Sequence, residues 1–166
     1  MATDQGLVYA AFIEEQLAWE KARQISLDER GSRLQQTVGL TSGLLVAGIG
    51  AISADVETIN IAGKSLFALT FIFLACAFVL GSNATRLRDY EVADVTTLFA
   101  MVNEQWSNTA ASSRNITAYV NIKSVDSLRS GNDKKAQALR RGIIAQGVGA
   151  GLAVVTFSAV ALAAGF

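Results

Sequence analysis

Histidine and proline are both absent from this chain of 166 residues, and Cys76 is its one cysteine. The absence of histidine removes the commonest general base and a favoured zinc ligand. The absence of proline leaves nothing to fix a kink, which favours long, unkinked helices. A lone cysteine cannot form a disulfide within the chain, so we interpret Cys76 as an inert packing thiol. Together these absences favour an all-helical protein with no metal centre.

Charge is missing from three apolar stretches, residues 34–54, 65–83 and 142–166. A helix rises about 1.5 Å per residue, so each stretch comes near the roughly 30 Å needed to cross the hydrocarbon layer of a bilayer. We therefore predict an all-α integral membrane bundle with three transmembrane helices and additional cytoplasmic helices. The expected order is an N-terminal cytoplasmic helix (1–33), a transmembrane hairpin (34–83), a cytoplasmic helical segment (84–141) and a third transmembrane helix (142–166).

The basic residues predict how this bundle is oriented. Thirteen of the fourteen Lys and Arg residues precede the first apolar stretch or lie between the second and the third, and only Lys64 lies elsewhere. Cytoplasmic loops of membrane proteins retain Lys and Arg, whereas short translocated loops tend to lack them. We expect a multi-pass protein of the cell inner (cytoplasmic) membrane with a cytoplasmic N-terminus, a short external loop at 55–64 and an external C-terminus.

Residues 7–33 have apolar and charged side chains interleaved at helical spacing. Ser26 and Glu29 have the spacing of a capping box, which would start a new helix there. Glu29 and Arg33 also have the four-residue spacing of a favourable ion pair within one helix. We favour a continuous or slightly bent helix that runs from the cytoplasm into the membrane.

An apolar stripe and a turn signal organise the cytoplasmic segment. The stripe runs from Val92 to Trp106 at intervals of three and four residues, on a helix of about 18 residues. We expect it to form a core face against the N-terminal helix, with a coiled-coil contact as the alternative. The residues from Ser130 to Asp133 signal a turn, in which Asn132 or Asp133 would cap a helix that begins at Lys134.

Glycines distinguish the first and third apolar stretches from the second, which carries four phenylalanines and Leu74 before its first glycine, Gly81. Gly39 and Gly43 lie on one face of the first stretch, and Gly147 and Gly151 repeat this spacing in the third. Such pairs allow two helices to approach closely in a membrane. The favoured interpretation is packing between the first and third spans of one chain, and the alternative is an interface between copies.

Catalytic groups are not evident in the sequence. The carboxylates of Asp89, Glu91, Asp94 and Glu104 are interpreted as a solvated helix face, because no histidine or cysteine converges with them. No phosphate-binding loop, dinucleotide fingerprint, nucleophile elbow or zinc spacing is present. The stretches also lack the ionisable groups of coupled transporters. A pore formed by several copies and lined by hydroxyl side chains is the alternative. We expect no enzyme, no catalytic residues and no cofactor.

The basic residues of the cytoplasmic segment could bind two kinds of anion, lipid headgroups and a small soluble ligand. Lys134, Lys135, Arg140 and Arg141 would lie at the level of the lipid headgroups, where anionic lipids attract them. The thirteen basic groups on the cytoplasmic side face twelve carboxylates, so no nucleic acid polymer is expected as a partner. A few basic residues could still hold a small anionic ligand between subunits.

Two segments resemble a known group of small bacterial membrane proteins. SLDERGSRLQQTVGLTSGLL (26–45) resembles the entry into the first span of Pycsar-type transmembrane effectors and the related SLATT-like effectors. NDKKAQALRRGIIAQGVG (132–149) resembles their later basic helix. The layout of an N-terminal helix, a hydrophobic hairpin, cytoplasmic helices and a final span is similar as well, although SLATT proteins usually have two spans.

The resemblance implies a role in defence against phage. Pycsar effectors respond to a cyclic pyrimidine mononucleotide (cUMP or cCMP), made by a partner cyclase, by impairing the inner membrane and causing abortive infection. Applied to this chain, the resemblance implies a nucleotide-binding homo-oligomer. From charge alone, the ligand would meet Arg114, Lys123 and Arg129. The alternatives are a non-enzymatic membrane scaffold or accessory subunit, which would dock a partner through the stripe at 92–106, and a phage holin.

Overall fold

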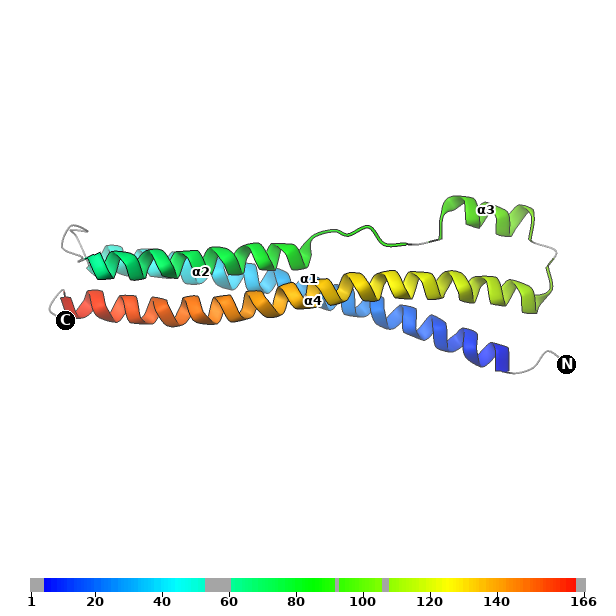
Figure 1. The fold of residues 1–166 in the computed structure, drawn as a ribbon, viewed down its shortest axis with the longest axis horizontal. Helices are drawn as coiled ribbons and strands as arrows, with labels where there is room; N and C mark the ends of the chain where they lie inside the picture. The colour runs from blue at the N-terminus through cyan, green and yellow to red at the C-terminus, as the bar shows by residue number, and fades with distance from the viewer. Residues whose placement is uncertain (1–4, 53–60, 92, 106–107, 164–166) are drawn as a thin grey trace. The chain divides into compact units, whose positions relative to one another are not determined.

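The computed structural model describes residues 5–52, 61–91, 93–105 and 108–163 (Figure 1). These residues form four α-helices and no strand, which confirms the predicted all-α class. The helices are α1 (Gln5–Ile52), α2 (Ile61–Thr85), α3 (Val95–Asn103) and α4 (Ala110–Ala163).

Continuity of the first helix is confirmed, because α1 runs without interruption through 48 residues. Ser26 lies inside this helix, so it caps no helix start. The predicted pair between Arg33 and Glu29 forms at 3.9 Å, with both side chains largely exposed. An exposed pair of this kind contributes only a few tenths of a kcal/mol, so packing rather than this pair accounts for the continuity.

The predicted turn at 130–133 is wrong, because α4 continues through it for 54 residues in all. Gly131 packs against Tyr90, where a Cβ atom would lie only 2.5 Å from the ring carbon Cε1. Asn132 is buried and donates hydrogen bonds to Glu20 of α1. Both residues are therefore explained by tertiary contacts, and those contacts override the local preference of glycine and asparagine for turns.

The stripe at 92–106 also folds differently from the expectation. Only Val95–Asn103 is helical, and α3 contains no buried residue. Its apolar side chains Val95, Leu98, Phe99 and Val102 are 50–63% exposed, so the predicted core face is wrong for this helix. Val92 and Trp106 lie outside the described residues.

The contacts of the chain divide it into two compact units, which we describe separately. The polar unit comprises residues 1–26 and 87–134, and the apolar unit comprises residues 27–86 and 135–166, within the parts that the structure describes. Helices α1 and α4 each contribute a segment to both units.

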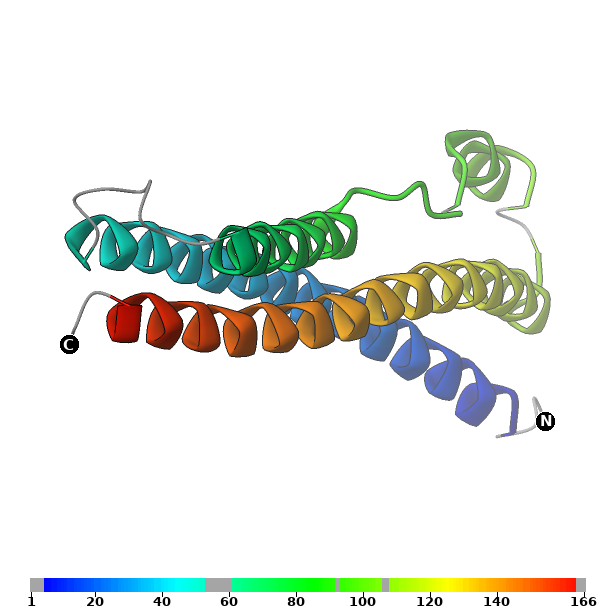
Figure 2. The same ribbon diagram turned by 60° about the vertical axis from the view of Figure 1, so that its left-hand side comes forward.

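The apolar unit is a bundle of α2 with the C-terminal parts of α1 and α4, which lie side by side in both views (Figures 1 and 2). Its core consists of Leu27, Leu34, Val38, Leu74, Ala77, Ala84 and Leu139. Glycines allow the helices to come close together: a Cβ on Gly142 would lie 2.7 Å from Leu34, and one on Gly149 would lie 2.9 Å from Leu74. These two positions, rather than those singled out by the sequence, mediate the close contacts of α4.

The four glycines predicted to pack helices have open surroundings instead. A Cβ built on Gly39, Gly43, Gly147 or Gly151 would meet no heavy atom within 4 Å. Among the described residues, contacts between the helices of one chain therefore do not use these glycines, and the alternative of an interface between copies stays a prediction. Cys76 is likewise exposed on α2 rather than packed in the core.

Two of the helices, α2 and α4, are long and apolar enough to cross a membrane, as judged over the described residues. α2 contains the predicted stretch at 65–83, and α4 contains the predicted stretch at 142–166 as far as Ala163; residues 164–166 lie outside the described part. The stretch at 34–54 is helical as far as Ile52 but does not meet the same test, and residues 53–54 lie outside the described part. Two candidate spans are therefore shown, and the third is not confirmed.

Candidate functional site: a buried polar cluster

The polar unit contains a buried carboxylate, Glu20, on the inner face of α1. Glu20 is only 7% exposed. Its Oε1 accepts a hydrogen bond from Nε of Arg129 at 3.0 Å, and its Oε2 accepts one from Nδ2 of Asn132 at 3.0 Å. Arg23, one turn along α1, donates to Oε2 at 3.5 Å. Two donors from α4 and one from α1 therefore surround one carboxylate, and together these four residues form what we call the polar cluster.

Asn132 is the least exposed member of the polar cluster, with an exposed fraction of 0%. In addition to the carboxylate, its Nδ2 donates to the backbone oxygen of Glu20 at 2.9 Å. Its Oδ1 is buried and has no hydrogen-bond partner within the described part of the chain. A buried amide with one unsatisfied oxygen costs free energy, about 1–3 kcal/mol by analogy with other proteins, so this position is held by its two donated bonds.

Electrostatics favour the ionised form of Glu20. Burial by itself raises the pKa of the carboxyl, but the hydrogen bonds from Asn132 and Arg129 and the charges of Arg23 and Arg129 outweigh burial and lower the pKa. Glu20 is thus an anion at neutral pH. A buried anion surrounded by donors fastens α1 to α4, but it is a poor general base because its affinity for a proton is reduced.

An outer ion pair extends the polar cluster towards solvent. Nη2 of Arg23 lies 2.8 Å from Oδ1 of Asp133. The hydrogen bond to Asp133 raises the pKa of Arg23 despite partial burial, so the guanidinium stays charged. Arg129 also donates to Gln16 at 3.5 Å. The side chains of Arg23 and Asp133 are 41% and 63% exposed, so solvent screens this pair and its contribution to stability is small.

A segment that follows α2 covers α4 next to the polar cluster. The backbone N–H of Glu91 donates to Oγ of Ser127 at 2.9 Å, and Tyr90 lies against Gly131. The Tyr90 hydroxyl and Nε of Arg88 are buried without a hydrogen-bond partner among the described residues. This segment gives Gly131 its role, because any larger residue would displace the Tyr90 ring.

The apolar unit has a buried charge of its own. Lys135 is 1% exposed, and its Nζ lies 2.5 Å from Oδ1 of Asp28. The prediction that Lys135 lies at the level of the lipid headgroups is therefore wrong, because Lys135 is buried and pairs with Asp28 of α1. Farther along the bundle, the buried hydroxyls of Thr70 and Thr156 lie 3.4 Å apart and join α2 to α4.

The structure does not gather Arg114, Lys123 and Arg129, the predicted ligand-binding residues, around one point. All three lie on α4, and Arg114 and Arg129 are about 22 Å apart along its axis. Nζ of Lys123 lies 5.0 Å from the centre of the Tyr119 ring, and Arg129 is bonded to Glu20. Their role in ligand binding stays a prediction.

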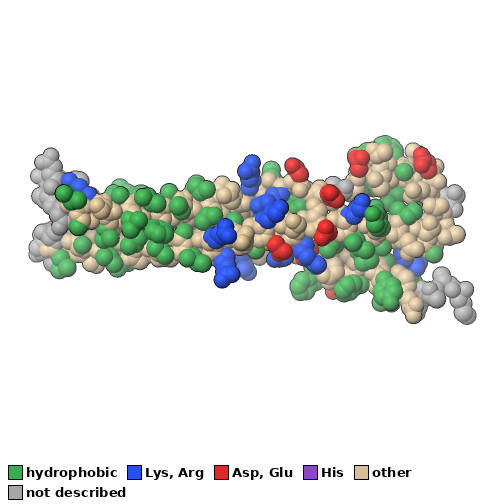
Figure 3. Space-filling model, in the orientation of Figure 1, with side chains coloured by type: hydrophobic (Ala, Val, Ile, Leu, Met, Phe, Trp, Pro, Cys, Tyr) green, Lys and Arg blue, Asp and Glu red, His purple; other side chains and the backbone are tan. Residues whose placement is uncertain are grey.

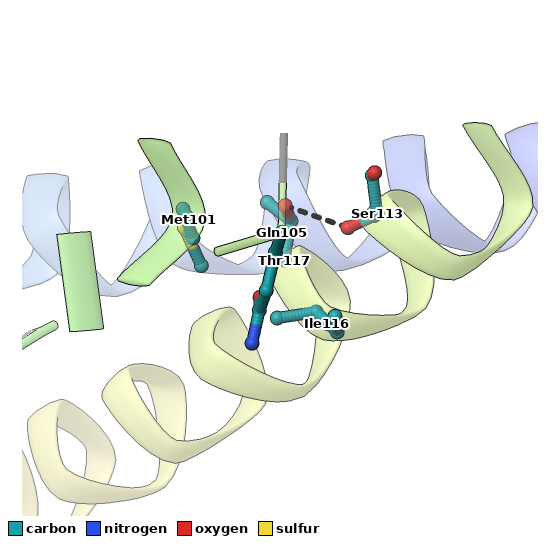
Figure 4. Close-up of a pocket in the computed structure, with 5 residues that line it drawn as sticks. All are labelled: Met101, Gln105, Ser113, Ile116 and Thr117. Carbon is teal, nitrogen blue, oxygen red and sulfur yellow. Dashed lines mark hydrogen bonds between the residues drawn. The ribbon is translucent and has the colours of Figure 1, made fainter. Parts of the chain in front are cut away.

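The polar unit has a cavity of about 270 Å³ (Figure 4). It lies between the C-terminal end of α3 and the first turns of α4. Its lining consists of Met101, Gln105, Ser113, Ile116 and Thr117, and the Thr117 hydroxyl donates to the backbone oxygen of Ser113 at 3.0 Å. None of these five described side chains is charged, so this lining is poorly suited to a phosphate-bearing ligand.

Sequence reasoning missed both Glu20 and Asn132. A signal was present: Glu20 continues the apolar spacing of Ile13, Leu17 and Leu27, and Asn132 continues that of Leu128 and Leu139. A polar residue in such a series is a candidate for burial with a partner. The interpretation as a turn concealed this signal on α4.

Comparison with known proteins adds no relative. No protein-family model matches this chain, and no curated protein or solved structure matches it either. Among the described residues, no group of three or more Cys, Asp or Glu side chains is placed to hold a metal ion. Fold and site define an all-helical protein that has two candidate membrane helices and a buried polar cluster between α1 and α4.

Proposed function

We propose that this chain is a three-span protein of the inner membrane, with a cytoplasmic polar unit. The main support is the exposed apolar surface of the apolar unit. Only 22% of the most apolar part of α2 and 17% of that of α4 is buried, whereas the core helix of a soluble protein is mostly buried, and this difference supports the proposal. Hydrophobic side chains cover the visible face of this unit (Figure 3).

The first span is proposed on the basis of its packing. Leu34, Val38 and Leu45 of α1 are buried, and the first two join the same core as α2 and α4. The part of α1 from 34 to 52 carries no charge and is about 28 Å long. Leu40 and Leu44 on its outer face are 69% and 74% exposed. A helix with this surface, packed along two membrane helices, is most stable when it crosses the bilayer with them.

A homo-oligomer is proposed from the open glycines. Gly39, Gly43, Gly147 and Gly151 lie on α1 and α4 with no neighbour within 4 Å of a built Cβ. In lipid, small residues of this kind favour close approach of another helix. A second copy of this chain supplies such helices without any other partner.

We further propose that the protein is a non-enzymatic, signal-gated effector that impairs the membrane. The observation that carries this proposal is the continuity of α1 and α4, each of which contributes to the polar unit and to the apolar unit without a break. A change in how these helices contact one another in the polar unit would reach the spans through the same helices. The triggering ligand, taken from the resemblance stated above, is a cyclic pyrimidine nucleotide made by a partner cyclase.

The ligand would be held between copies. Arg114 and Lys123 keep partial or full exposure on α4 and have no carboxylate within 4 Å in the described parts. Since one chain does not gather its basic residues, a phosphate would need these side chains from more than one copy. Arg129 is the least available of the three because Glu20 occupies it.

Membrane potential in living bacteria tests this function. Cells express the protein with or without a cyclase that makes cyclic UMP or cyclic CMP in the absence of phage. Their membrane potential is followed with a voltage-sensitive dye. The proposal expects depolarisation only when protein and nucleotide are both present. An unchanged potential at saturating nucleotide contradicts gating. Lysis on a fixed schedule without nucleotide favours a holin instead.

A second candidate, a membrane scaffold or accessory subunit, is favoured by one observation. The apolar side chains of α3 are exposed, and no core of the described chain covers them. Affinity purification of the wild type and of a Leu98→Ser, Phe99→Ser variant tests this alternative. One stoichiometric partner that the variant loses, in cells without toxicity, favours the scaffold over the effector.

A further inference from the structure

One end of the apolar unit presents five exposed arginines, of which two lie on α1, two lie on α4 and one directly follows the last residue of α2. This end is formed by residues 27–33 of α1, by the last two residues of α2 with Arg86 after them, and by residues 135–141 of α4. We call the group the arginine collar; its members are Arg30, Arg33, Arg86, Arg140 and Arg141. In Figure 3, Lys and Arg side chains gather at one end of the surface that hydrophobic side chains cover.

Packing contacts place α1 and α2 at the same level in the arginine collar. Gly31 of α1 lies so close to α2 that a Cβ would come within 2.7 Å of Cγ2 of Thr85. Arg30 precedes Gly31, and Arg86 follows Thr85. The two arginines therefore flank one helix contact.

A second contact brings α4 to this level. A Cβ on Gly142 would lie 2.7 Å from Cδ2 of Leu34. Arg141 precedes Gly142, and Arg33 precedes Leu34. Arg140 is the next residue along α4, so the whole collar lies within about two helical turns of these two contacts.

The charge of the collar is not neutralised by the described part of the chain. Four of its members have no carboxylate within 4.0 Å, and the fifth, Arg33, reaches only the exposed Glu29 at 3.9 Å. Arginines of the polar cluster differ: Arg23 and Arg129 are bonded to carboxylates at 2.8 and 3.0 Å. The collar therefore keeps its guanidinium groups free for a ligand from outside the chain.

We propose that the arginine collar binds the phosphate groups of anionic phospholipids. This inference rests on the membrane placement proposed above. Guanidinium groups bind phosphate oxygens through paired hydrogen bonds, which ammonium groups do not reproduce. Directly beside the collar, Ile143 and Ile144 are 54% and 58% exposed and lie where acyl chains would cover them. An anionic phospholipid satisfies both surfaces with one molecule, whereas free phosphate leaves the apolar surface uncovered.

Native mass spectrometry of the full-length protein tests the site. The protein is reconstituted, released into a mild detergent and titrated with phosphatidylglycerol or with phosphatidylcholine. An Arg140→Gln, Arg141→Gln variant removes two collar charges, and Lys64→Gln removes one charge at the other end of α2 as the control. Each basic residue near a membrane surface contributes a factor of about five to binding of anionic lipid. We expect phosphatidylglycerol to bind more tightly than phosphatidylcholine, with a loss of about 25-fold in the double variant and no change in Lys64→Gln.

Three results would overturn the collar site. Equal affinity for the two lipids would show that the arginines do not select charge. An equal loss in Lys64→Gln and in the double variant would show a response to net charge alone. If inorganic phosphate displaced the lipid at a concentration equal to that of the lipid, the ligand of the collar would be a soluble anion rather than a phospholipid. If alkaline carbonate extracts the protein from membranes, the membrane placement itself fails, which is distinct from failure of the collar in a protein that reconstitutes.

Discussion

Glu20 and Asn132 show how two residues determine the contact of α1 with α4 in the polar unit. The carboxylate is buried, and its pKa is lowered because donors from Asn132 and Arg129 outweigh the effect of burial. A lowered pKa means that the folded state binds the proton more weakly than the unfolded state does. The stability that this site contributes is therefore present above the ordinary pKa of 4.5 and is lost as the pH falls through the lower value of the folded protein.

A Glu20→Gln variant tests this linkage. It keeps the size of the side chain but removes the charge that Arg129 and Arg23 bind. At pH 7 we expect the variant to unfold at a lower temperature than the wild type, with a free energy of unfolding lower by about 1–3 kcal/mol. Below pH 4 we expect the difference between variant and wild type to be smaller. Circular dichroism in detergent at both pH values measures it. Glu15→Gln, on the exposed face of the same helix, serves as the control, and an identical pH dependence in Glu20→Gln and the wild type would contradict the assignment.

Replacing Lys135 and replacing Asp28 are expected to destabilise the protein by different amounts. Lys135 is 1% exposed, whereas the side chain of Asp28 is 38% exposed. Asp28→Ala leaves a buried ammonium unpaired, so we expect a loss on the order of 2 kcal/mol, below the range for fully buried pairs. Lys135→Met replaces the buried charge by an apolar side chain of similar length and is expected to cost less. Unfolding in denaturant ranks the two variants, and a larger loss for Lys135→Met would refute this explanation.

Among the elements, α4 shows both what the sequence predicts and what it does not. The all-helical class, the long α1 and the extents of α2 and of the end of α4 follow from uncharged runs and helical spacing. The turn at 130–133 was wrong because glycine and asparagine are judged locally in a sequence. Their role depends on Tyr90 and Glu20, which are distant along the chain and become neighbours only in the fold.

The glycines of α4 illustrate the same limit. Spacing identified Gly147 and Gly151, but the close helix contacts use Gly142 and Gly149. Spacing alone identifies a face of a helix and does not tell whether that face meets another helix of the same chain. The candidate ligand residues of α4 have the same difficulty, because charge alone does not reveal that Glu20 already occupies Arg129.

Valine substitutions at two glycines of α4 separate these roles. Gly142→Val places methyl groups against Leu34 and Leu80, so we expect overpacking that destabilises the apolar unit by about 1–3 kcal/mol. Gly147→Val meets no neighbour in the described chain, so the unfolding temperature should hold while self-association weakens. Thermal unfolding and light scattering in detergent measure the two effects. Equal destabilisation by both variants would contradict the packing described for α4.

For the molecule as a whole, the distribution of basic residues predicts its orientation in the membrane. We expect the arginine collar and the polar unit on the cytoplasmic side of the membrane, and Lys64 on the other side. In a Cys76→Ser background, Lys64→Cys should react with a membrane-impermeant maleimide in intact spheroplasts. Lys123→Cys should react only after permeabilisation. The reverse pattern of labelling would show that the orientation is inverted.

We propose that a cytoplasmic signal changes the packing of the spans, and ion flux in liposomes tests this proposal most directly. The purified protein is reconstituted in vesicles containing phosphatidylglycerol, with a potassium diffusion potential across the membrane and a voltage-sensitive dye. We predict that cyclic UMP or cyclic CMP collapses the potential in vesicles with protein and has no effect in vesicles without it. A potential that holds at saturating nucleotide, in vesicles shown by protease protection to contain inserted protein, would contradict the account.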